Sequence, residues 1–302
     1  MPTLFWTGEL SFSMKMLMNI SNILAWITGN ARDTAAMKER VKLGYEGAYS
    51  DHVAQYDIEG TDHYRRIAAT LLENLDVQSK EVLDVGCGTG ILSLLALRQG
   101  AAKVVCGDLS EHMLEQCRQK ATIQGYDREH IDFCQLDSES LPFADNSFDT
   151  VLSSMVLGLV PDQEQVVVEM TRVLRSGGSL ALSTHGPGHY MEAIDAALRA
   201  TSKRYLVGYR IEFWPRKERE LRRILSRAGL LDIQTHRLTH SDSFDTGEKA
   251  YDFFASTSAS WWYSKFPPAK VEGDSRRIRA YFEHREITTI TQDVIFACGH
   301  KP

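Results

Sequence analysis

Short apolar runs alternate with longer amphipathic segments between residues 81 and 298, and this alternation predicts strands followed by helices. The first runs are apolar at consecutive positions, which is typical of strands buried on both faces of a parallel sheet. Strands are expected at 82–85, 103–108, 149–156, 179–183, 231–238 and 289–298, with a further strand and its loop at 131–143, and helices at 91–97, 163–174, 188–203 and 218–230. The last strand alternates in polarity and is expected to run antiparallel.

The N-terminal part of the chain is predicted to be helical over residues 31–75, with Asp33 and Thr34 capping a start at Ala35. A preceding apolar segment, residues 10–29, is interrupted by Lys15 and by asparagines and serines. We interpret it as an amphipathic helix packed on the domain or on a partner. A membrane-surface anchor, which would allow peripheral membrane association, and a cleaved or spanning segment are the alternatives; stable membrane insertion is not expected.

The composition is that of a globular protein: the chain has 302 residues, and 43% of them are hydrophobic. Its formal net charge of -6 disfavours a broad phosphate-binding surface, so no nucleic-acid partner is expected. The five cysteines are scattered and form no Cys-x-x-Cys pair. Neither a disulfide framework nor a metal site is therefore predicted, and a reducing cytoplasm is the expected location.

The stretch from Glu81 to Gly90 joins a predicted strand to a predicted helix through glycines at alternate positions, Gly86, Gly88 and Gly90. Glycines let the backbone turn sharply and approach a ligand that a Cβ atom would hold off. A strand, a glycine turn and a helix N-terminus together form a nucleotide-type cradle. The spacing is Gly-x-Gly-x-Gly, whereas the dinucleotide fingerprint is Gly-x-Gly-x-x-Gly, and Asp84 stands two residues before the first glycine.

A second acid, Asp108, ends the next predicted strand. In a strand–helix–strand unit of this kind, such a carboxylate can accept hydrogen bonds from both hydroxyls of a ribose, because its two oxygens match the spacing of a vicinal diol. The glycine turn and Asp108 together predict a nucleoside-like ligand at the carboxyl ends of the first two strands.

These segments resemble motifs of the class I S-adenosylmethionine-dependent methyltransferases, with a general pattern most similar to the ubiquinone/menaquinone-biosynthesis type. The glycine stretch resembles motif I, and residues 108–114 resemble the family's Asp-x-Ser-x-x-Met-Leu. Residues 137–151 resemble Asp-Ala-Glu-x-Leu-Pro-Phe-x-Asp-x-Ser-Phe-Asp-x-Val, with Ser138 in place of alanine. Residues 172–178 resemble Arg-Val-Leu-Lys-Pro-Gly-Gly, with Ser176 where proline is usual.

The resemblance implies S-adenosylmethionine as the cofactor and a set of residues that hold it. Asp137 would accept a hydrogen bond from the adenine amino group, the Ser138 N–H would face a ring nitrogen, and Asp84 would approach the charged amine of the methionine end. Residues 49–57 are similar to the family's Tyr-Asp-x-x-Ala-x-x-Tyr-Asp, although these tyrosines could equally just bury their rings. The implied cofactor-binding residues are Tyr56, Asp84, Gly86, Cys87, Gly88, Gly90, Asp108, Leu109, Met113, Asp137, Ser138 and Ser154.

The fold implied by the resemblance is an α/β fold: a Rossmann-like, seven-stranded, mostly parallel sheet with an antiparallel last strand and helices on both faces. An N-terminal helical arm and a helical substrate-cap insert are added to it. The expected division is residues 1–48 as the arm, 49–238 as the S-adenosylmethionine-binding domain, 239–287 as the insert and 288–302 as the final strand.

On the acceptor side, the fourth predicted strand is not followed by the Asn/Asp-Pro-Pro-aromatic tetrad or by the Pro-Cys pair of enzymes that methylate bases. His185 leaves the end of the fifth strand and is the catalytic candidate as a general base, with a purely hydrogen-bonding loop role as the alternative. Aromatic residues of the C-terminal half could line an apolar pocket or form the insert's own core. The substrate-pocket candidates are His189, Tyr209, Trp214, Phe254 and Trp262.

The leading hypothesis is an enzyme that transfers methyl from S-adenosylmethionine to a small, apolar or aromatic acceptor by in-line displacement. An RNA or protein methyltransferase and a non-catalytic S-adenosylmethionine-binding regulatory module are the alternatives. The expected partner is a small-molecule acceptor, and a homodimer is left open. An arsenite-type enzyme would need clustered cysteines, which the sequence alone does not test.

Overall fold

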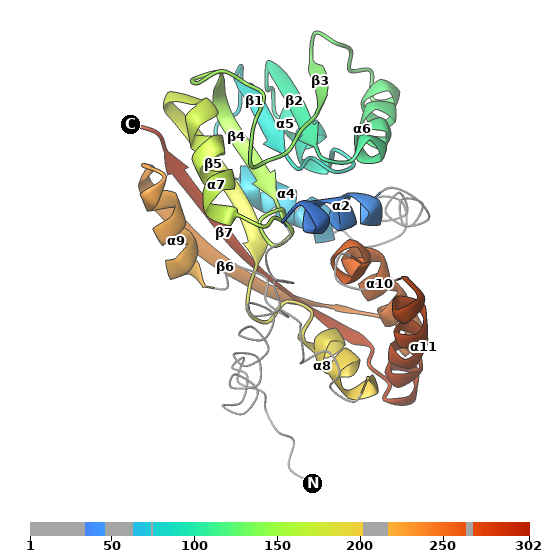
Figure 1. The fold of residues 1–302 in the computed structure, drawn as a ribbon. Helices are drawn as coiled ribbons and strands as arrows, with labels where there is room; N and C mark the ends of the chain where they lie inside the picture. The colour runs from blue at the N-terminus through green and yellow to red at the C-terminus, as the bar shows by residue number, and fades with distance from the viewer. Residues whose placement is uncertain (1–33, 46–62, 74, 202–216, 264–267) are drawn as a thin grey trace.

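Seven strands form one mixed sheet in the computed structural model, which describes residues 34–45, 63–73, 75–201, 217–263 and 268–302 (Figure 1). The strand order is β3-β2-β1-β4-β5-β7-β6, and β7 runs antiparallel to both of its neighbours. The predicted seven-stranded sheet with an antiparallel last strand is therefore confirmed. The strands are β1 (Glu81–Val85), β2 (Lys103–Asp108), β3 (Ile131–Gln135), β4 (Phe148–Ser154), β5 (Leu174–His185), β6 (Leu231–Ser243) and β7 (Thr289–His300).

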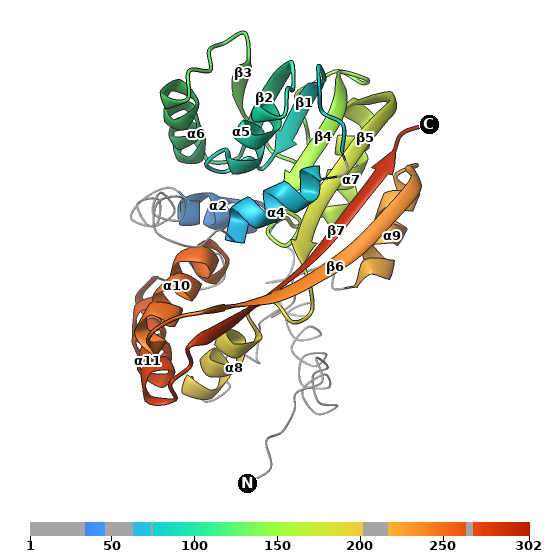
Figure 2. The same ribbon diagram turned by 180° about the vertical axis from the view of Figure 1, so that it is seen from behind.

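Helices cover both faces of the sheet (Figures 1 and 2). One face carries α4 (His63–Leu72), α5 (Ile91–Arg98) and α6 (Glu111–Ile123), and the other carries α7 (Gln163–Val173) and α9 (Glu218–Arg227). On β1, Val82 packs in the hydrophobic core under α4, α5 and α6, and Leu83 packs in the core under α7 and α9. Both residues are fully buried. This two-sided burial explains why the parallel strands are apolar at consecutive positions.

β6 is longer than the predicted strand 231–238, because it continues to Ser243. The added residues pair with β7 through Ser243 and Thr289, so the two strands run beyond the rest of the sheet as a long ribbon (Figure 2). Residues 239–243 read Thr-His-Ser-Asp-Ser, and their polar composition gave no signal of a strand.

A helical unit packs at the far end of this ribbon. It consists of α8 (Met191–Ala200), α10 (Gly247–Tyr263) and α11 (Pro268–His284). Its core contains Phe253, Phe254 and Phe282, which are at most 7% exposed. The segment predicted as a helical insert thus contains α10 and α11, and α8 packs against α11 and β7.

The helix α2 (Thr34–Tyr45) belongs to the predicted N-terminal arm, and it packs against α10. It lies between the carboxyl ends of the parallel strands and the helical unit (Figure 1). Among the described residues, no helix has both the length and the apolar character that a membrane crossing would require. Residues 10–29, which carry the prediction of an amphipathic segment, lie outside the described part of the chain.

Candidate cofactor site and acceptor side

The glycine turn after β1 has the conformation that its sequence predicts. Gly86, Gly88 and Gly90 all have positive φ values, of 73°, 54° and 89°. The Gly86 N–H donates to the Gly107 carbonyl on β2 at 2.7 Å, and a Cβ atom on Gly86 would lie 2.2 Å from Val156 Cγ2. Around Gly88, by contrast, nothing lies within 4 Å of a Cβ position, so this residue borders open space. The turn is tightly packed on one side and accessible at its tip.

Asp84 lies under this turn and is almost completely buried. Its Oδ2 accepts a hydrogen bond from the Ser93 hydroxyl at 2.5 Å, whereas its Oδ1 is buried with no partner among the described residues. Burial is the main cause that raises the pKa of Asp84 to about 8, and Cys106 adds to it. A cationic group beside Oδ1 would favour the ionised form, as the predicted contact with a ligand amine requires. Ser93 has no counterpart in the predicted site.

Asp108 connects β2 to the glycine turn. Its Oδ2 accepts from the Gly88 N–H and its Oδ1 from the Ser110 N–H, both at 2.9 Å. Burial raises the pKa of Asp108, although the backbone N–H donors oppose this change. Both oxygens are therefore held in fixed directions next to the open tip of the turn, as a diol acceptor would need.

Asp137 closes a small turn at the end of β3, where its Oδ1 accepts from the Glu139 N–H at 3.0 Å. The Lys38 ammonium of α2 lies 2.6 Å from Asp137 Oδ2 and 2.6 Å from Glu139 Oε2. Burial alone would lower the pKa of Lys38, but the two carboxylates raise it above its usual value. The sequence gave no indication of this contact, because about 100 residues separate the partners.

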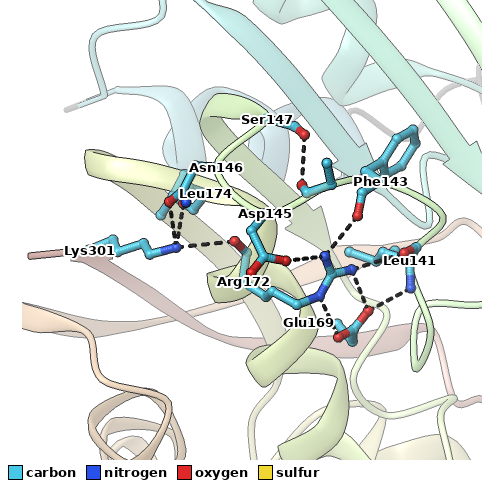
Figure 3. A network of polar contacts seen from close by, with 10 residues as sticks. Leu141, Phe143, Asp145, Asn146, Ser147, Glu169, Arg172, Leu174 and Lys301 are labelled. Carbon is cyan, nitrogen blue, oxygen red and sulfur yellow. Dashed lines mark hydrogen bonds and ion pairs between the residues drawn. The ribbon is translucent and has the colours of Figure 1, made fainter.

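Arg172 of α7 fixes the loop that follows Asp137 (Figure 3). Its guanidinium donates to the carbonyls of Leu141 and Phe143, at 2.9 and 2.7 Å, and to the carboxylate of Glu169 at 2.8 Å. Glu169 in turn accepts from the Leu141 N–H. These contacts explain why an arginine stands in the helix before the Gly-Gly turn, and they hold the predicted adenine loop against the sheet.

The other predicted cofactor residues lie around the same edge of the sheet. Met113 is buried on α6, Leu109 and Ser138 are half-buried, and the Ser154 hydroxyl at the end of β4 lies 3.0 Å from that of Ser183. The structure thus places the strand-end acids, the glycines and the predicted adenine loop at one edge of the sheet. Tyr56 lies outside the described residues, so its role stays a prediction.

The predicted acceptor side begins where β5 ends. His185 and His189 are both buried, with ring centroids 4.7 Å apart at a right-angled orientation. Burial is the main cause that lowers the pKa of His185 well below its usual value and that of His189 to about 4. Both imidazoles are therefore neutral at pH 7, and His185 is a weaker base than an exposed histidine.

Asp293 on β7 holds the loop between these histidines. The side chain is fully buried, accepts from the Gly188 N–H at 2.6 Å, and pairs with the Arg237 guanidinium through two bonds of 2.6 Å. A Cβ atom on Gly186 would collide with the Asp293 carboxylate. The Gly-Pro-Gly loop, residues 186–188, therefore packs closely against the carboxylate of Asp293. The sequence did not indicate this contact.

Of the predicted pocket aromatics, Phe254 lies in the core of the helical unit, with its ring centroid 5.7 Å from that of Tyr190 and 6.3 Å from that of Phe282. This packing matches the alternative interpretation, in which the aromatic residues form the insert's own core. Trp262 lies on α10, but its side chain is outside the described part, as are Tyr209 and Trp214. Their contact with an acceptor remains a prediction.

Three of the five cysteines, although scattered in the sequence, come together in the core below the glycine turn. Cys87, Cys106 and Cys117 have sulfur atoms within 4.8 Å of one another, and the Cys117 thiol donates to Cys106 at 3.7 Å. Burial raises the pKa of Cys87 and Cys106 well above the usual value, so both are thiols at neutral pH. All five cysteines are free.

Comparisons with known proteins agree with this geometry. A family model described as a methyltransferase domain matches residues 83–182. The chain is 33% identical over 196 residues to a demethylmenaquinone methyltransferase of Clavibacter sepedonicus, a match that covers 60% of this chain and 77% of that protein. It is 38% identical over 119 residues to the methyltransferase GfsG of Streptomyces halstedii, with 39% of this chain and 42% of the relative covered. The chain thus spans less than half the length of that relative.

Solved structures show the same fold. The YcgJ protein of Bacillus subtilis superimposes with a TM-score of 0.55 at 19% identity, covering 78% of this chain and 98% of that one. Phosphoethanolamine N-methyltransferase 2 of Haemonchus contortus, in complex with S-adenosyl-L-methionine, gives a TM-score of 0.54 at 16% identity, covering 87% of this chain and 60% of that one. At such identities the likeness concerns the fold alone.

Proposed function

The chain belongs to the class I S-adenosylmethionine-dependent methyltransferases, and from this premise we propose that it transfers a methyl group from S-adenosylmethionine to a small, apolar or aromatic acceptor. The observation that carries the proposal is the presence of three carboxylates at the carboxyl ends of three neighbouring strands, with the glycine turn following the first strand and bonded to the second carboxylate. Asp84 is the last residue but one of β1, Asp108 ends β2, and Asp137 follows β3. The three strands are neighbours in the sheet.

The residues present fit the cofactor. Asp84 Oδ1 is a buried acceptor without a partner among the described residues, which suits a cationic amine. The open space beside Gly88 admits a ligand close to the backbone, and Asp108 next to it offers a carboxylate to a ribose. Asp137, with the Ser138 N–H beside it, would bind the adenine edge. Together these groups would hold the three polar parts of S-adenosylmethionine.

When bound, S-adenosylmethionine supplies a methyl group on a sulfonium, which a nucleophile can displace in line. The protein's contribution would be to position the acceptor and to exclude water. His185 is neutral but weakly basic in its buried setting, so we assign most of the rate to positioning rather than to proton removal. This assignment suits acceptors that react as a thiolate, a phenolate or a neutral amine.

An apolar or aromatic acceptor is supported by two observations. The relative with 77% of its length matched is named a demethylmenaquinone methyltransferase. The end of β5 also leads directly into α8 and the aromatic helical unit, with Tyr190 at the junction. The absence of a disulfide among the five cysteines fits the reducing cytoplasm that we propose as the location. Nucleic acid is not part of the proposal.

Calorimetry tests the cofactor site. Asp108→Ala and Gly88→Val should each weaken S-adenosylmethionine binding strongly, because the first removes the diol acceptor and the second fills the open tip of the turn. Asp195→Ala is the matched control, since Asp195 is exposed and its ion pair among the described residues is with Arg199 on the surface of α8. Wild-type affinity in both site variants would rule out this assignment.

A labelled-methyl screen with a panel of quinone precursors, phenols, thiols and amines tests the reaction. Transfer to one of these acceptors, lost in Asp108→Ala and kept in Asp195→Ala, is the expected result. Binding of S-adenosylmethionine without transfer to any acceptor would favour a regulatory module instead. Salt-dependent retention of RNA, followed by its methylation, would favour the nucleic-acid alternative.

A further inference from the structure

Four histidine rings form a chain from the end of β5 to the outer strand β6. The ring centroids of His185 and His189 are 4.7 Å apart, those of His189 and His63 6.0 Å, and those of His63 and His240 5.6 Å. Asp242 follows His240 on the same face of β6, because both lie two residues apart on one strand. The acceptor side of the molecule is thus bordered by imidazoles that end at a carboxylate.

His63 stands out in this chain because it is fully buried and has no hydrogen-bond partner for either ring nitrogen among the described residues. Gln292 Oε1, opposite His240 on β7, is a second buried polar atom without such a partner. Buried polar groups are paired in the great majority of cases, so unpaired ones indicate a binding role or an ion. The unpaired atoms of His63 and Gln292 both lie near His240, so they indicate that a ligand binds beside these residues.

The atoms beside His63 already surround a cation, the guanidinium of Arg66. The Arg66 Nη2 donates to His240 Nε2 at 2.9 Å and to Asp242 Oδ1 at 2.8 Å. Because arginine only donates, His240 Nε2 must direct its lone pair at the guanidinium, and Asp242 directs a carboxylate oxygen at the same point. One ligand atom from each of His63, His240 and Asp242 lies within 4.8 Å of the other two.

We propose that His63, His240 and Asp242 bind one divalent transition-metal ion of the zinc class. Two neutral imidazoles and a carboxylate form a donor set that such ions accept, and three protein ligands leave a coordination position for water or for an oxygen of the acceptor. The sequence predicted no metal site, because its ligands are about 180 residues apart along the chain.

The surroundings of the three ligands fit this role. His63 has no exposed surface and both of its ring nitrogens are without a partner among the described residues, so either nitrogen is available to an ion. The Gln292 amide donates to Asp242 Oδ2 at 3.1 Å and so leaves Oδ1 directed at the site. The Arg66 side chain is 48% exposed, so it can turn into solvent when the ion takes its place.

The test uses the full-length protein freed of metal with a chelator and titrated with Co²⁺, followed by visible absorption, and with Zn²⁺, followed by calorimetry. One ion per chain is expected. His63→Ala and Asp242→Asn should each weaken binding by at least about tenfold. His130→Ala is the matched control, because His130 forms an exposed histidine–aspartate pair with Asp127 and should leave the affinity unchanged.

Arg66→Gln provides an independent variant on the surface, which keeps the test informative if His63→Ala does not fold. Removal of the competing guanidinium should tighten Zn²⁺ binding by about tenfold, since a full positive charge no longer opposes the ion. The proposal is overturned if neither the wild type nor Arg66→Gln binds Zn²⁺ with one-to-one stoichiometry, or if His63→Ala and Asp242→Asn bind as the wild type does. None of these readouts depends on methyl transfer.

Discussion

At the scale of single residues, Asp84 shows how a carboxyl group that we propose to bind a ligand can cost stability. Its carboxyl group is buried, and one oxygen is bonded to Ser93 while the other has no partner among the described residues. Its pKa in the folded protein is about 8, against 3.8 as the usual value. The folded state therefore binds one more proton than the unfolded state between these two pH values, and stability must fall as pH rises through this range.

Asp84→Asn should remove that pH dependence. We expect the variant to be more stable than the wild type at pH 8, by about 2–4 kcal/mol, because an amide carries no charge to desolvate. At pH 4 the two proteins should differ little, since the aspartic acid is protonated there. Urea unfolding at both pH values, without added cofactor, measures the difference. An equal loss of stability from pH 4 to pH 8 in both proteins would show that other groups cause it.

Asp293 joins three parts of the chain through one carboxylate: β7, the Arg237 guanidinium on β6 and the loop at Gly188. Asp293→Asn keeps the shape but removes the charge, so it should lower the free energy of unfolding by about 3 kcal/mol, as for other broken buried pairs. It should also raise KM for the acceptor more than it lowers kcat, because the loop that carries His189 loses its anchor.

The matched control is Asp195→Asn, in an exposed pair with Arg199 whose members are 56% and 58% exposed. Such a pair contributes little, so the change should stay within about 0.5 kcal/mol. Chemical denaturation and steady-state kinetics on both variants distinguish the two cases. Similar losses in both would mean that burial of Asp293 has no special effect.

At the scale of elements, the ribbon of β6 and β7 connects the sheet to the helical unit of α8, α10 and α11. The helical unit has its own aromatic core, and Phe282 of α11 lies at its centre with no exposed surface. The unit contacts the rest of the chain mainly through α2, which packs on α10, and through β7, which contacts α8 and α10. The unit should therefore be able to loosen while the central sheet remains folded.

Phe282→Ala tests this separation. Loss of a buried ring should cost about 3–5 kcal/mol within the helical unit. Hydrogen exchange followed by mass spectrometry should then show faster exchange in α10 and α11, with β1, β2 and β4 as protected as in the wild type. Uniformly faster exchange across the molecule would instead mean that unit and sheet unfold as one.

At the scale of the whole molecule, the sequence predicted the parts that depend on neighbouring residues. The strand, glycine turn and helix from Glu81 to Arg98 are local, and so are the two-sided apolar strands that fix the seven-stranded sheet. The extension of β6 escaped prediction because its residues are polar, and they pair only because β7 lies beside them. A polar strand of this kind forms because a neighbouring strand pairs with it, and its own sequence does not predict it.

The polar clusters could not be predicted for a related reason. Lys38 reaches Asp137, Arg237 reaches Asp293, and His63 lies beside His240, yet each pair is separated by 50 residues or more. Hydrogen-bonding residues carry no periodic signal that would indicate a distant partner. The glycine turn and the acids at the strand ends were therefore predictable from their motifs, whereas the polar contacts around them and beyond the end of β5 were not.

The position of α2 has a consequence for the order in which ligands bind. Its Lys38 bonds to the loop that we assign to adenine, and its Tyr45 carbonyl accepts from the Ser110 hydroxyl at 3.4 Å. The helix also packs on α10 of the helical unit. A single helix thus contacts both halves of the proposed active site. If the bound cofactor holds α2 in place, the acceptor no longer has to do so and binds more tightly. The acceptor must then strengthen cofactor binding by the same factor, because the coupling free energy between two sites is equal in both directions.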